Sequence, residues 1–506
     1  MSAPQDFHCP DWVRSAVFYQ IFPDRFARSP KYECAGSFHN WGAKPEVHGF
    51  CGGNLRGIIE KLDYIQDLGA NALYLCPIFK SAANHRYHTV DYLQIDPVLG
   101  TIEDFDELVR EVHKREMRII LDGVFNHCSR GFFPFVSAME EGEASPYKNW
   151  FHFHSFPVNA YSEKPNYDCW WGMPALPKFN TDNLETREYL LRVAEFWIRR
   201  GIDGWRLDVP NEIDDDDFWR EFRRRVKKWN PEAYIVGEIW EDPSRWLAGD
   251  QFDGVMNYPV RKLALRFLFP EGMSSSNAVS TGDPTAVSVS GMDAAEFCNA
   301  FQNLLERKLF GVQMNLFGSH DTARLLTLAG GNSCRAAVAW ALLLTLPGAI
   351  SLYYGDEIGM EGGKDPDNRR CFPWQELPDA QNSEIFRLVQ TFLAFRKREP
   401  AMSMGTFSIR PEGQGLLICR QYNKTLVELR LGFPGPVPLP GISARTEVIY
   451  ESGKSPIAGV AGYFVAKDGI VLTIDWYMSE EGRKWTEECT SGEYLKWIEM
   501  NYKERT

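Results

Sequence analysis

Acidic side chains stand at or just after the ends of three apolar segments of the chain. Asp208 lies at the end of GIDGWRLDV, Glu238 lies near the end of AYIVGEIW, and Asp321 follows GVQMNLFG. Arg206 precedes Asp208 by two residues, so in a strand both side chains point to the same face. His320 comes directly before Asp321. Carboxyl groups that meet at one place can act as proton donor, base or nucleophile.

A fourth acid, Asp122, lies in the segment RIILDGV and is followed by Asn126 and His127. A single acid at a strand end is more often a helix cap or a salt-bridge partner than a catalytic group. Acids at several neighbouring strand ends, interleaved with arginine and histidine, are harder to explain structurally. The sequence therefore predicts a cluster of catalytic carboxylates.

The elements that must position this cluster are short apolar strands that alternate with predicted helices, one of them at 54–69. Strands that alternate with helices indicate βα units and a parallel sheet. Eight such strands predict an α/β fold, the (β/α)8 TIM barrel, whose enzymes carry their chemistry at the carboxyl ends of the strands. The predicted strands are 16–22, 71–77, 118–124, 201–209, 233–240, 252–258, 311–318 and 349–355.

The gap between the third strand and the next helix is too long for an ordinary loop, which predicts a B subdomain inserted over the barrel mouth. After about residue 400 the apolar pattern has period two, which predicts a C-terminal antiparallel β-sandwich domain. A Ser/Gly/Thr-rich stretch, 270–292, is predicted to be a mobile loop. The predicted boundaries are 1–127 and 185–398 for the barrel, 128–184 for the insertion, 399–477 for the β domain and 478–506 for a polar tail.

Composition limits the classes of molecule that the protein is expected to bind. The formal net charge is −13, and we therefore expect no nucleic-acid partner, because nucleic-acid binding relies on basic patches. Aromatic residues make up 14% of the chain, with 16 Trp. Such a content suits a cleft for sugars, and it also suits a large barrel that buries many rings.

Cysteine usage and the N-terminus predict a cytoplasmic protein. The 11 Cys are an odd, dispersed number without a C-x-x-C pair, which fits free thiols in a reducing compartment. The first 15 residues show no secretory signal pattern. The most apolar stretch, 336–355, has Pro347-Gly348 in its middle. We expect a buried helix, a turn and a buried strand there, and no membrane span.

Several motifs together give the chain a marked resemblance to the α-amylase superfamily, glycoside hydrolase family 13. Within it the chain is most similar to the neopullulanase, cyclomaltodextrinase and maltogenic-amylase group. Its YHT and PNE forms resemble those of debranching-type bacterial members. The strings that carry the resemblance are YQIFPDRFA (19–27), NHRYHTVDYLQIDPVLG (84–100), LPKFNTDN (176–183), MNYPV (256–260) and GDEIGMEGGKDPDNRR (355–370).

The resemblance implies a role for each member of the cluster. Asp208 would be the nucleophile, Glu238 the general acid and then the base, and Asp321 the stabiliser of the transition state. Arg206 would keep the nucleophile ionised. Two carboxyl groups of this kind are the equipment of a retaining glycosidase. Substrate-binding roles are implied for Tyr87, Asp122, His127, Arg206, His320, Asp365, Arg369, Trp240 and Glu212.

Two departures from the group qualify what the resemblance implies. Members of the group usually begin with a carbohydrate-binding domain that forms much of their dimer interface. Here the first barrel strand begins near residue 16, so we expect a member without that domain and leave the oligomeric state open. The insertion reads MPALPKFN where the group has a shorter M-P-K-L-N form, so loop geometry there need not transfer.

The function implied is a retaining α-glucan hydrolase acting on maltodextrins, cyclodextrins, pullulan or short glycogen and starch branches, with transglycosylation as a side reaction. Alternatives within the class are a dedicated α-1,6 debranching enzyme and an α-glucosidase. An alternative of another class is a non-catalytic, transporter-associated barrel protein, which we disfavour because all three acids are present. The sequence leaves open α-1,4 against α-1,6 preference, the preferred substrate, and the ratio of hydrolysis to transfer.

Many relatives hold a structural calcium near the first barrel loop, on a cluster of Asp and Asn oxygens. The corresponding loop here, 26–41, has Glu33 as its one acid and carries Arg28 and Lys31. Asn54 stands where relatives have an aspartate. Calcium prefers six to eight oxygen ligands including carboxylates, so calcium binding is not expected. The carboxylate chemistry needs no cofactor, and no metal ligand is assigned.

Overall fold

The structure is a computed structural model. It describes residues 9–34, 36–269, 291–306, 312–381, 383–412, 415–423, 425–431, 445–450 and 463–467. Most of the loop predicted at 270–292, and the whole predicted tail 478–506, lie outside these residues. The chain forms two compact units. The first comprises Met1–Val13, Phe18–Asn257 and Arg369–Trp374, and the second comprises Arg14–Val17, Tyr258–Asn368 and Gln375–Thr506.

All eight predicted barrel strands are present, and the fold class is confirmed. Hydrogen-bonded neighbours follow the order β8-β7-β6-β5-β2-β1-β10-β9. The pairs β1–β2, β2–β5, β5–β6, β6–β7, β7–β8 and β9–β10 are all parallel. Its strands are β1 (Val17–Ile21), β2 (Ala72–Leu75), β5 (Arg118–Gly123), β6 (Gly204–Leu207), β7 (Tyr234–Gly237), β8 (Gly254–Val255), β9 (Met314–Leu316) and β10 (Ala349–Tyr353).

The strands are shorter than predicted, chiefly at their carboxyl ends. β6 ends at Leu207 and β7 at Gly237, so Asp208 and Glu238 are each the first residue beyond a strand. Register keeps these ends level, because Leu207 pairs with Gly237. The apolar pattern continues past the last ladder hydrogen bond, which is why periodicity alone overestimates the strand length.

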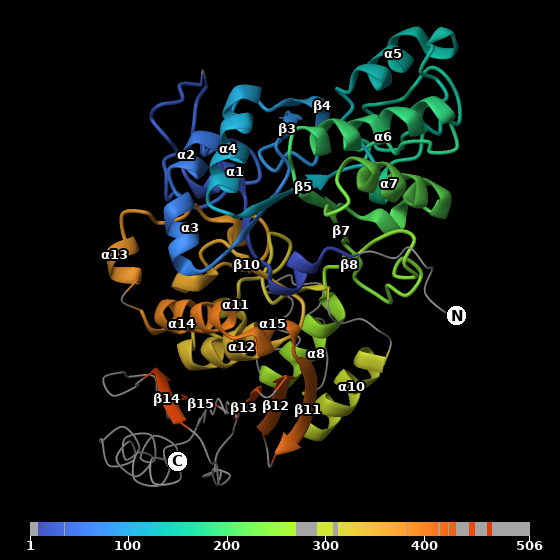
Figure 1. Cartoon of the computed structure of the whole chain (residues 1–506). Coiled ribbons are helices and arrows are strands. Elements are labelled where there is room, and N and C mark those ends of the chain that lie inside the picture. Colours follow the sequence, from blue (N-terminus) through green and yellow to red (C-terminus); the bar gives the residue numbers. More distant parts are fainter. Residues whose placement is uncertain are drawn as a thin grey trace. The chain divides into compact units, whose positions relative to one another are not determined.

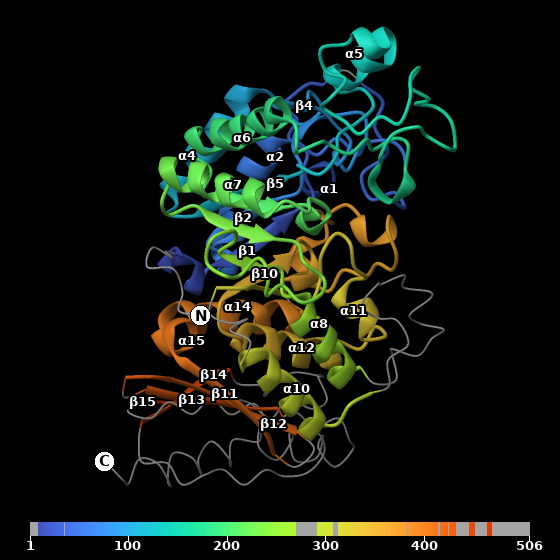
Figure 2. The ribbon, with the colours of Figure 1, turned by 90° about the vertical axis from the view of Figure 1, so that its right-hand side faces the viewer.

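The helices of the first unit cover its parallel strands. Figures 1 and 2 show α6 and α7 side by side, and α4 contacts β5. Side-chain caps fix where these helices begin: Thr101 and Asp104 form a capping box on α4, and Asp215 caps α7. The helices are α1 (Pro23–Phe26), α2 (Leu55–Ile59), α3 (Leu62–Leu68), α4 (Ile102–Lys114), α5 (Phe133–Glu141), α6 (Leu184–Arg199) and α7 (Asp216–Trp229).

Two local features of the first unit differ from the predictions. The helix predicted at 54–69 is broken into α2 and α3. The motif 84–100 lies on an unpredicted antiparallel hairpin, β3 (Phe79–Ser81) and β4 (Thr89–Ile95). Between these strands a loop carries Tyr87. The hairpin matters for function because it brings that ring back toward the strand ends.

In the second unit, the apolar stretch 336–355 forms the predicted helix, turn and strand. α12 precedes β10, and Gly348 makes the turn with φ +94, a conformation that favours glycine. No helix of the described residues is long and apolar enough to cross a membrane. α12 lies beside α14 (Figure 1). The helices are α8 (Tyr258–Leu268), α10 (Ala294–Glu306), α11 (Leu325–Leu328), α12 (Ser333–Thr345), α13 (Leu377–Ala380), α14 (Glu384–Arg398) and α15 (Pro400–Met404).

The C-terminal part of the second unit is antiparallel, as predicted. Three strands form a meander with the order β11-β12-β13, and two further strands pair with each other. These strands are β11 (Thr406–Glu412), β12 (Gly415–Tyr422), β13 (Thr425–Leu431), β14 (Arg445–Tyr450) and β15 (Tyr463–Lys467).

Candidate active site

Arg206 is the centre of the site in the first unit. It lies in β6, and its side chain is fully buried. One terminal nitrogen, Nη1, donates to Asp122 Oδ1 at 2.8 Å and to Asp208 Oδ1 at 2.9 Å. The other, Nη2, forms an ion pair with Glu238 Oε1 at 2.9 Å. One guanidinium therefore holds three buried carboxyl groups from three neighbouring strands.

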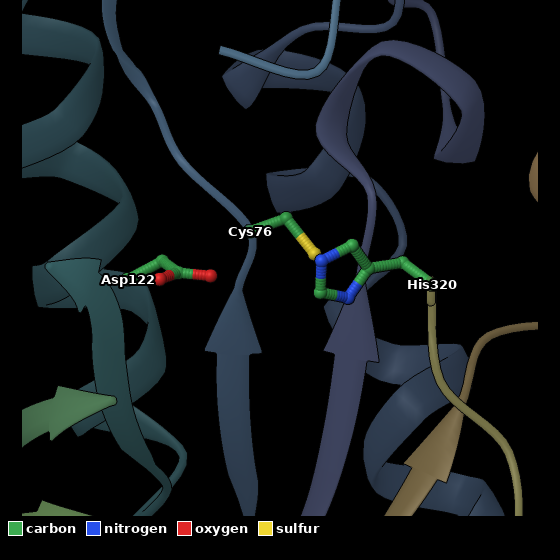
Figure 3. Close-up of side chains that lie close together, drawn as sticks. All are labelled: Cys76, Asp122 and His320. Carbon is green, nitrogen blue, oxygen red and sulfur yellow. The ribbon is translucent and has the colours of Figure 1, made fainter. Parts of the chain in front are cut away.

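Asp122 lies in β5, and Cys76 directly follows the neighbouring strand β2 (Figure 3). The hydroxyls of Tyr74 and Tyr87 donate to Asp122 Oδ2 at 2.7 and 2.8 Å. Burial raises the pKa of Asp122, and Arg206 opposes that shift. Burial also raises the pKa of both tyrosines well above the usual value, so they stay protonated donors. Asp122 is thus held on both of its oxygens.

One ion pair and two hydrogen bonds hold the Glu238 carboxyl group. Besides Arg206, the indole Nε1 of Trp240 donates to Oε1 at 3.2 Å, and the backbone amide of Val209 donates to Oε2 at 3.0 Å. Trp240, for which the resemblance implies substrate binding, thus also contacts the predicted acid. Both predicted catalytic carboxylates of this unit are thereby fixed around one guanidinium.

Val209 has a strained backbone. Its φ is +36 and its ψ is +50, the left-handed region that a β-branched residue rarely adopts. Such a residue costs of order 1–3 kcal/mol and persists where surrounding contacts enforce it. Val209 follows Asp208 directly, and its conformation turns the amide toward Glu238. The strain therefore links the two predicted catalytic residues through the backbone.

His127 is buried just beyond β5. Tyr92 donates from its hydroxyl to the His127 carbonyl at 2.7 Å, and the Asn126 side-chain nitrogen lies 3.1 Å from His127 Nδ1. Burial lowers the pKa of His127 to about 3. The ring is therefore neutral at the pH values at which most enzymes work, and it can hydrogen-bond a ligand without carrying charge.

This depressed pKa predicts a pH-dependent stability. The unfolded chain takes up a proton on His127 as the pH falls through about 6.5, whereas the folded chain resists it until about pH 3. The contribution of neutral His127 to stability is therefore fully present above pH 6.5, and it is lost as the pH falls from about 6.5 to about 3. His127→Asn should flatten the slope of unfolding free energy against pH by up to about 1.4 kcal/mol per pH unit.

Urea unfolding between pH 4.5 and 7 measures that slope. An identical slope in wild type and His127→Asn would contradict the burial argument.

The other residues predicted at a strand end, His320 and Asp321, belong to the second unit and follow β9. His320 (Figure 3) is buried, and its Nε2 lies 3.1 Å from Asp321 Oδ2. The Asn368 side chain donates to the carbonyls of His320 and Thr322 at 2.7 and 3.0 Å. This unit therefore holds His320 and Asp321 as a fixed pair.

The remaining predicted sugar contacts lie on loops. Asp365 is exposed, whereas Arg369 is buried with its guanidinium 5.3 Å from the centre of the Phe22 ring. Glu212 is half-buried, and the Lys178 ammonium donates to the Glu212 carbonyl at 3.0 Å. Lys178 belongs to the inserted segment, so that segment is tied directly to the loop that follows the predicted nucleophile.

Sequence reasoning missed three residues of the first-unit site. Tyr74 lies in β2, two residues before Cys76, so the period-two pattern of a strand places both side chains on the same face. That pattern could have identified Tyr74 as an inward-facing residue. Val209 acts through its backbone amide and Lys178 through a contact between distant loops. No residue-type signal marks either of them.

Comparison with known proteins decides the family. The model of the α-amylase catalytic domain matches residues 20–405. The chain belongs to the α-amylase family. It is 45% identical over 404 residues to a cyclomaltodextrinase of Geobacillus thermopakistaniensis, covering 79% of this chain and 65% of that protein. It is 41% identical to the intracellular maltogenic amylase of Bacillus subtilis, covering 78% and 63%.

The chain thus spans about two thirds or slightly less of the length of these curated relatives. Among solved structures it resembles the native debranching enzyme of Nostoc punctiforme, with 43% identity, a TM-score of 0.77, and coverage of 90% of this chain and 92% of that chain. The predicted membership of the glycoside hydrolases of this family, including its cyclomaltodextrinase-like group, is confirmed.

Proposed function

We propose that this α-amylase family protein is a retaining α-glucan hydrolase that cleaves maltodextrins, cyclodextrins, pullulan or short branches. The observation that carries the proposal is the contact of one buried guanidinium with both Asp208 and Glu238. Two carboxyl groups that share a cation at adjacent strand ends form the pair that double displacement requires. The cyclomaltodextrinase and debranching relatives support the substrate class.

In the proposed reaction, Asp208 attacks the anomeric carbon while Glu238 protonates the departing glycosidic oxygen. This forms a glycosyl ester on Asp208 and releases the leaving-group sugar. Glu238, now ionised, takes a proton from water, and the water oxygen attacks the anomeric carbon and breaks the ester. A sugar hydroxyl in place of water gives transglycosylation. Asp321 binds sugar hydroxyls as positive charge develops on the ring.

Substrate-binding roles are proposed for Tyr87, His127 and His320 on the sugar that becomes esterified. Asp365 and Arg369 are assigned to the sugar on its non-reducing side. Trp240 and Glu212 are assigned to the leaving-group side. Asp122 and Arg206 position the carboxylates, since both side chains are fully buried and contact each other and further protein groups. A cytoplasmic location is proposed from the free cysteines of the described residues and the intracellular relative.

Release of reducing sugar from maltodextrin tests the activity, and the products from pullulan separate the two linkage preferences. Panose means α-1,4 cleavage and maltotriose means α-1,6 cleavage. The likeness to the Nostoc punctiforme debranching enzyme favours a dedicated α-1,6 enzyme as the second candidate. An inactive chain on every α-glucan would overturn the proposal in favour of a non-catalytic barrel protein.

Glu238→Gln should lose most activity on substrates whose leaving group must be protonated as it departs. Natural maltodextrins have poor leaving groups, and general acid catalysis contributes about 10²–10⁴-fold. Aryl maltosides with a good leaving group need little protonation, so their first step should fall far less. Steady-state rates on both substrates, with burst kinetics to identify the limiting step, measure the difference. An equal loss on both, with bond cleavage limiting, would refute the acid role.

Calcium removal should leave the enzyme unaffected. In the loop where relatives hold the ion, the Arg28 guanidinium lies over the Phe38 and Trp41 rings, at 5.2 and 5.8 Å from their centres. The Asn54 side chain caps α2 by accepting from the Gly57 amide at 2.8 Å. A guanidinium cation, and an amide oxygen already occupied by a helix cap, suit a calcium ion poorly.

Thermal midpoint and turnover, measured before and after exhaustive chelation, test this prediction. We expect no change in either. A fall of many degrees that added calcium restores would show that the loop or another site binds the ion.

A further inference from the structure

Three aromatic rings are stacked in a column that runs from the active site to solvent. The His127 and Trp170 ring centres are 5.1 Å apart with an interplanar angle of 15°. The Trp170 and Trp171 centres are 4.8 Å apart at 19°. His127 is buried and Trp170 is half-buried, whereas Trp171 is 78% exposed. One face of the Trp171 indole therefore covers Trp170, and its other face is open.

The turn that presents Trp171 is strained. Trp171 has φ +49 and ψ +31, and the following Gly172 has φ +70. A bulky residue is strained in this region. Backbone hydrogen bonds enforce the turn: Met173 donates to the Trp170 carbonyl at 2.9 Å, and Leu176 donates to the Met173 carbonyl at 3.0 Å. The fold thus holds a tryptophan in a costly conformation that buries little of its surface.

This turn is tied to the segment that bears His127. Phe179 donates to the Asn126 carbonyl at 3.0 Å, and Cys128 donates to the Pro177 carbonyl at 3.1 Å. The two bonds lie on either side of His127 in the sequence. The column is therefore held by backbone bonds and is positioned relative to the predicted sugar-binding histidine.

Trp170 adds a second observation that points to a ligand. Its indole Nε1 is buried and has no hydrogen-bond partner among the described residues. An unsatisfied buried donor destabilises the folded chain, and such groups in native structures call for an explanation. A ligand hydroxyl close to the column would satisfy this donor.

We propose that the open face of Trp171 binds a glucosyl ring of an oligosaccharide, while Trp170 Nε1 donates to a sugar hydroxyl. A glucosyl ring presents C–H groups of partial positive charge that suit the negative face of an indole. The proposal rests on the proposed function, because it assumes that an α-glucan is bound at His127. It makes Trp171 an outer subsite that only longer chains reach.

The test is a chain-length series from maltotriose to maltoheptaose. Trp171→Ala should lower kcat/KM about tenfold on maltoheptaose, mainly through KM, and the loss should shrink as the substrate shortens. Trp171→Phe keeps a flat ring and should retain most of the affinity. Tyr161→Ala is the matched control: Tyr161 is also 78% exposed in the inserted segment, but its ring faces the Arg130 guanidinium at 4.6 Å. This control should show no length-dependent loss.

Titration calorimetry of maltoheptaose with Asp208→Asn proteins gives a second readout that does not need turnover. Adding Trp171→Ala should weaken binding about tenfold. If the wild type cleaves maltodextrins but Trp171→Ala loses the same factor at every length, or nothing at any length, the subsite is wrong and the proposed function stands. A changed oligomeric state with an unchanged length profile would also overturn it. If the wild type neither binds nor cleaves α-glucans, the proposed function itself fails.

Discussion

Asp208→Ala should lower kcat on maltodextrin by at least about 10⁴-fold, because the glycosyl-enzyme can no longer form. The Asp208 side chain is buried just beyond β6 and contacts Arg206. No other described carboxylate occupies this position. The fold should survive, because Arg206 keeps its contacts with Asp122 and Glu238. Single-turnover kinetics on maltodextrin and circular dichroism measure the two effects.

Asp217→Ala is the control for this variant. The Asp217 side chain is 83% exposed on α7, and its loss should leave kcat within about twofold, since surface substitutions change little. A folded Asp208→Ala protein with activity near wild type would show that another group is the nucleophile.

Arg206→Met should have the largest combined effect on stability and activity. It removes the one cation that contacts Asp122, Asp208 and Glu238, and leaves three buried carboxyl groups without it. Breaking a buried ion pair in this way costs about 3–5 kcal/mol. Without the cation, the three carboxyl groups would repel one another and move from their positions. The rate should therefore fall by several orders of magnitude.

Arg206→Lys should recover only part of this loss. In Arg206 two terminal nitrogens contact different carboxylates, and the single ammonium nitrogen of lysine cannot replace both. Arg224→Met is the surface control: Arg224 is 62% exposed and pairs with Glu221, a contact worth at most about 1 kcal/mol. Urea unfolding and kcat/KM are compared for all three. A stable, active Arg206→Met protein would refute the view that this guanidinium organises the site.

The sequence alone predicts the barrel strands and the strand-end carboxylates because both depend on local periodicity. Asp208 and Glu238 lie where the apolar runs stop, and parallel pairing then brings such ends together. The break between α2 and α3 and the β3–β4 hairpin are not predictable in this way. Their form depends on tertiary packing, which overrides the local helical pattern of 54–69.

The finer geometry of the site also exceeds what residue types reveal. The hydrogen bond from Val209 to Glu238 depends on a backbone conformation that valine rarely adopts. The stacking of Trp170 on His127 joins two segments far apart in the sequence. Composition suggested a sugar cleft through its many aromatics, but it could not distinguish a buried ring such as Trp205 from an exposed one such as Trp171.

Nuclear magnetic resonance of the first sugar released from maltodextrin tests the central claim, double displacement through Asp208. Two successive inversions at the anomeric carbon restore the starting configuration. The account predicts that the α anomer appears first and that the β anomer grows in only as the product mutarotates. A first-formed β anomer would mean direct attack by water, and would contradict the role given to Asp208.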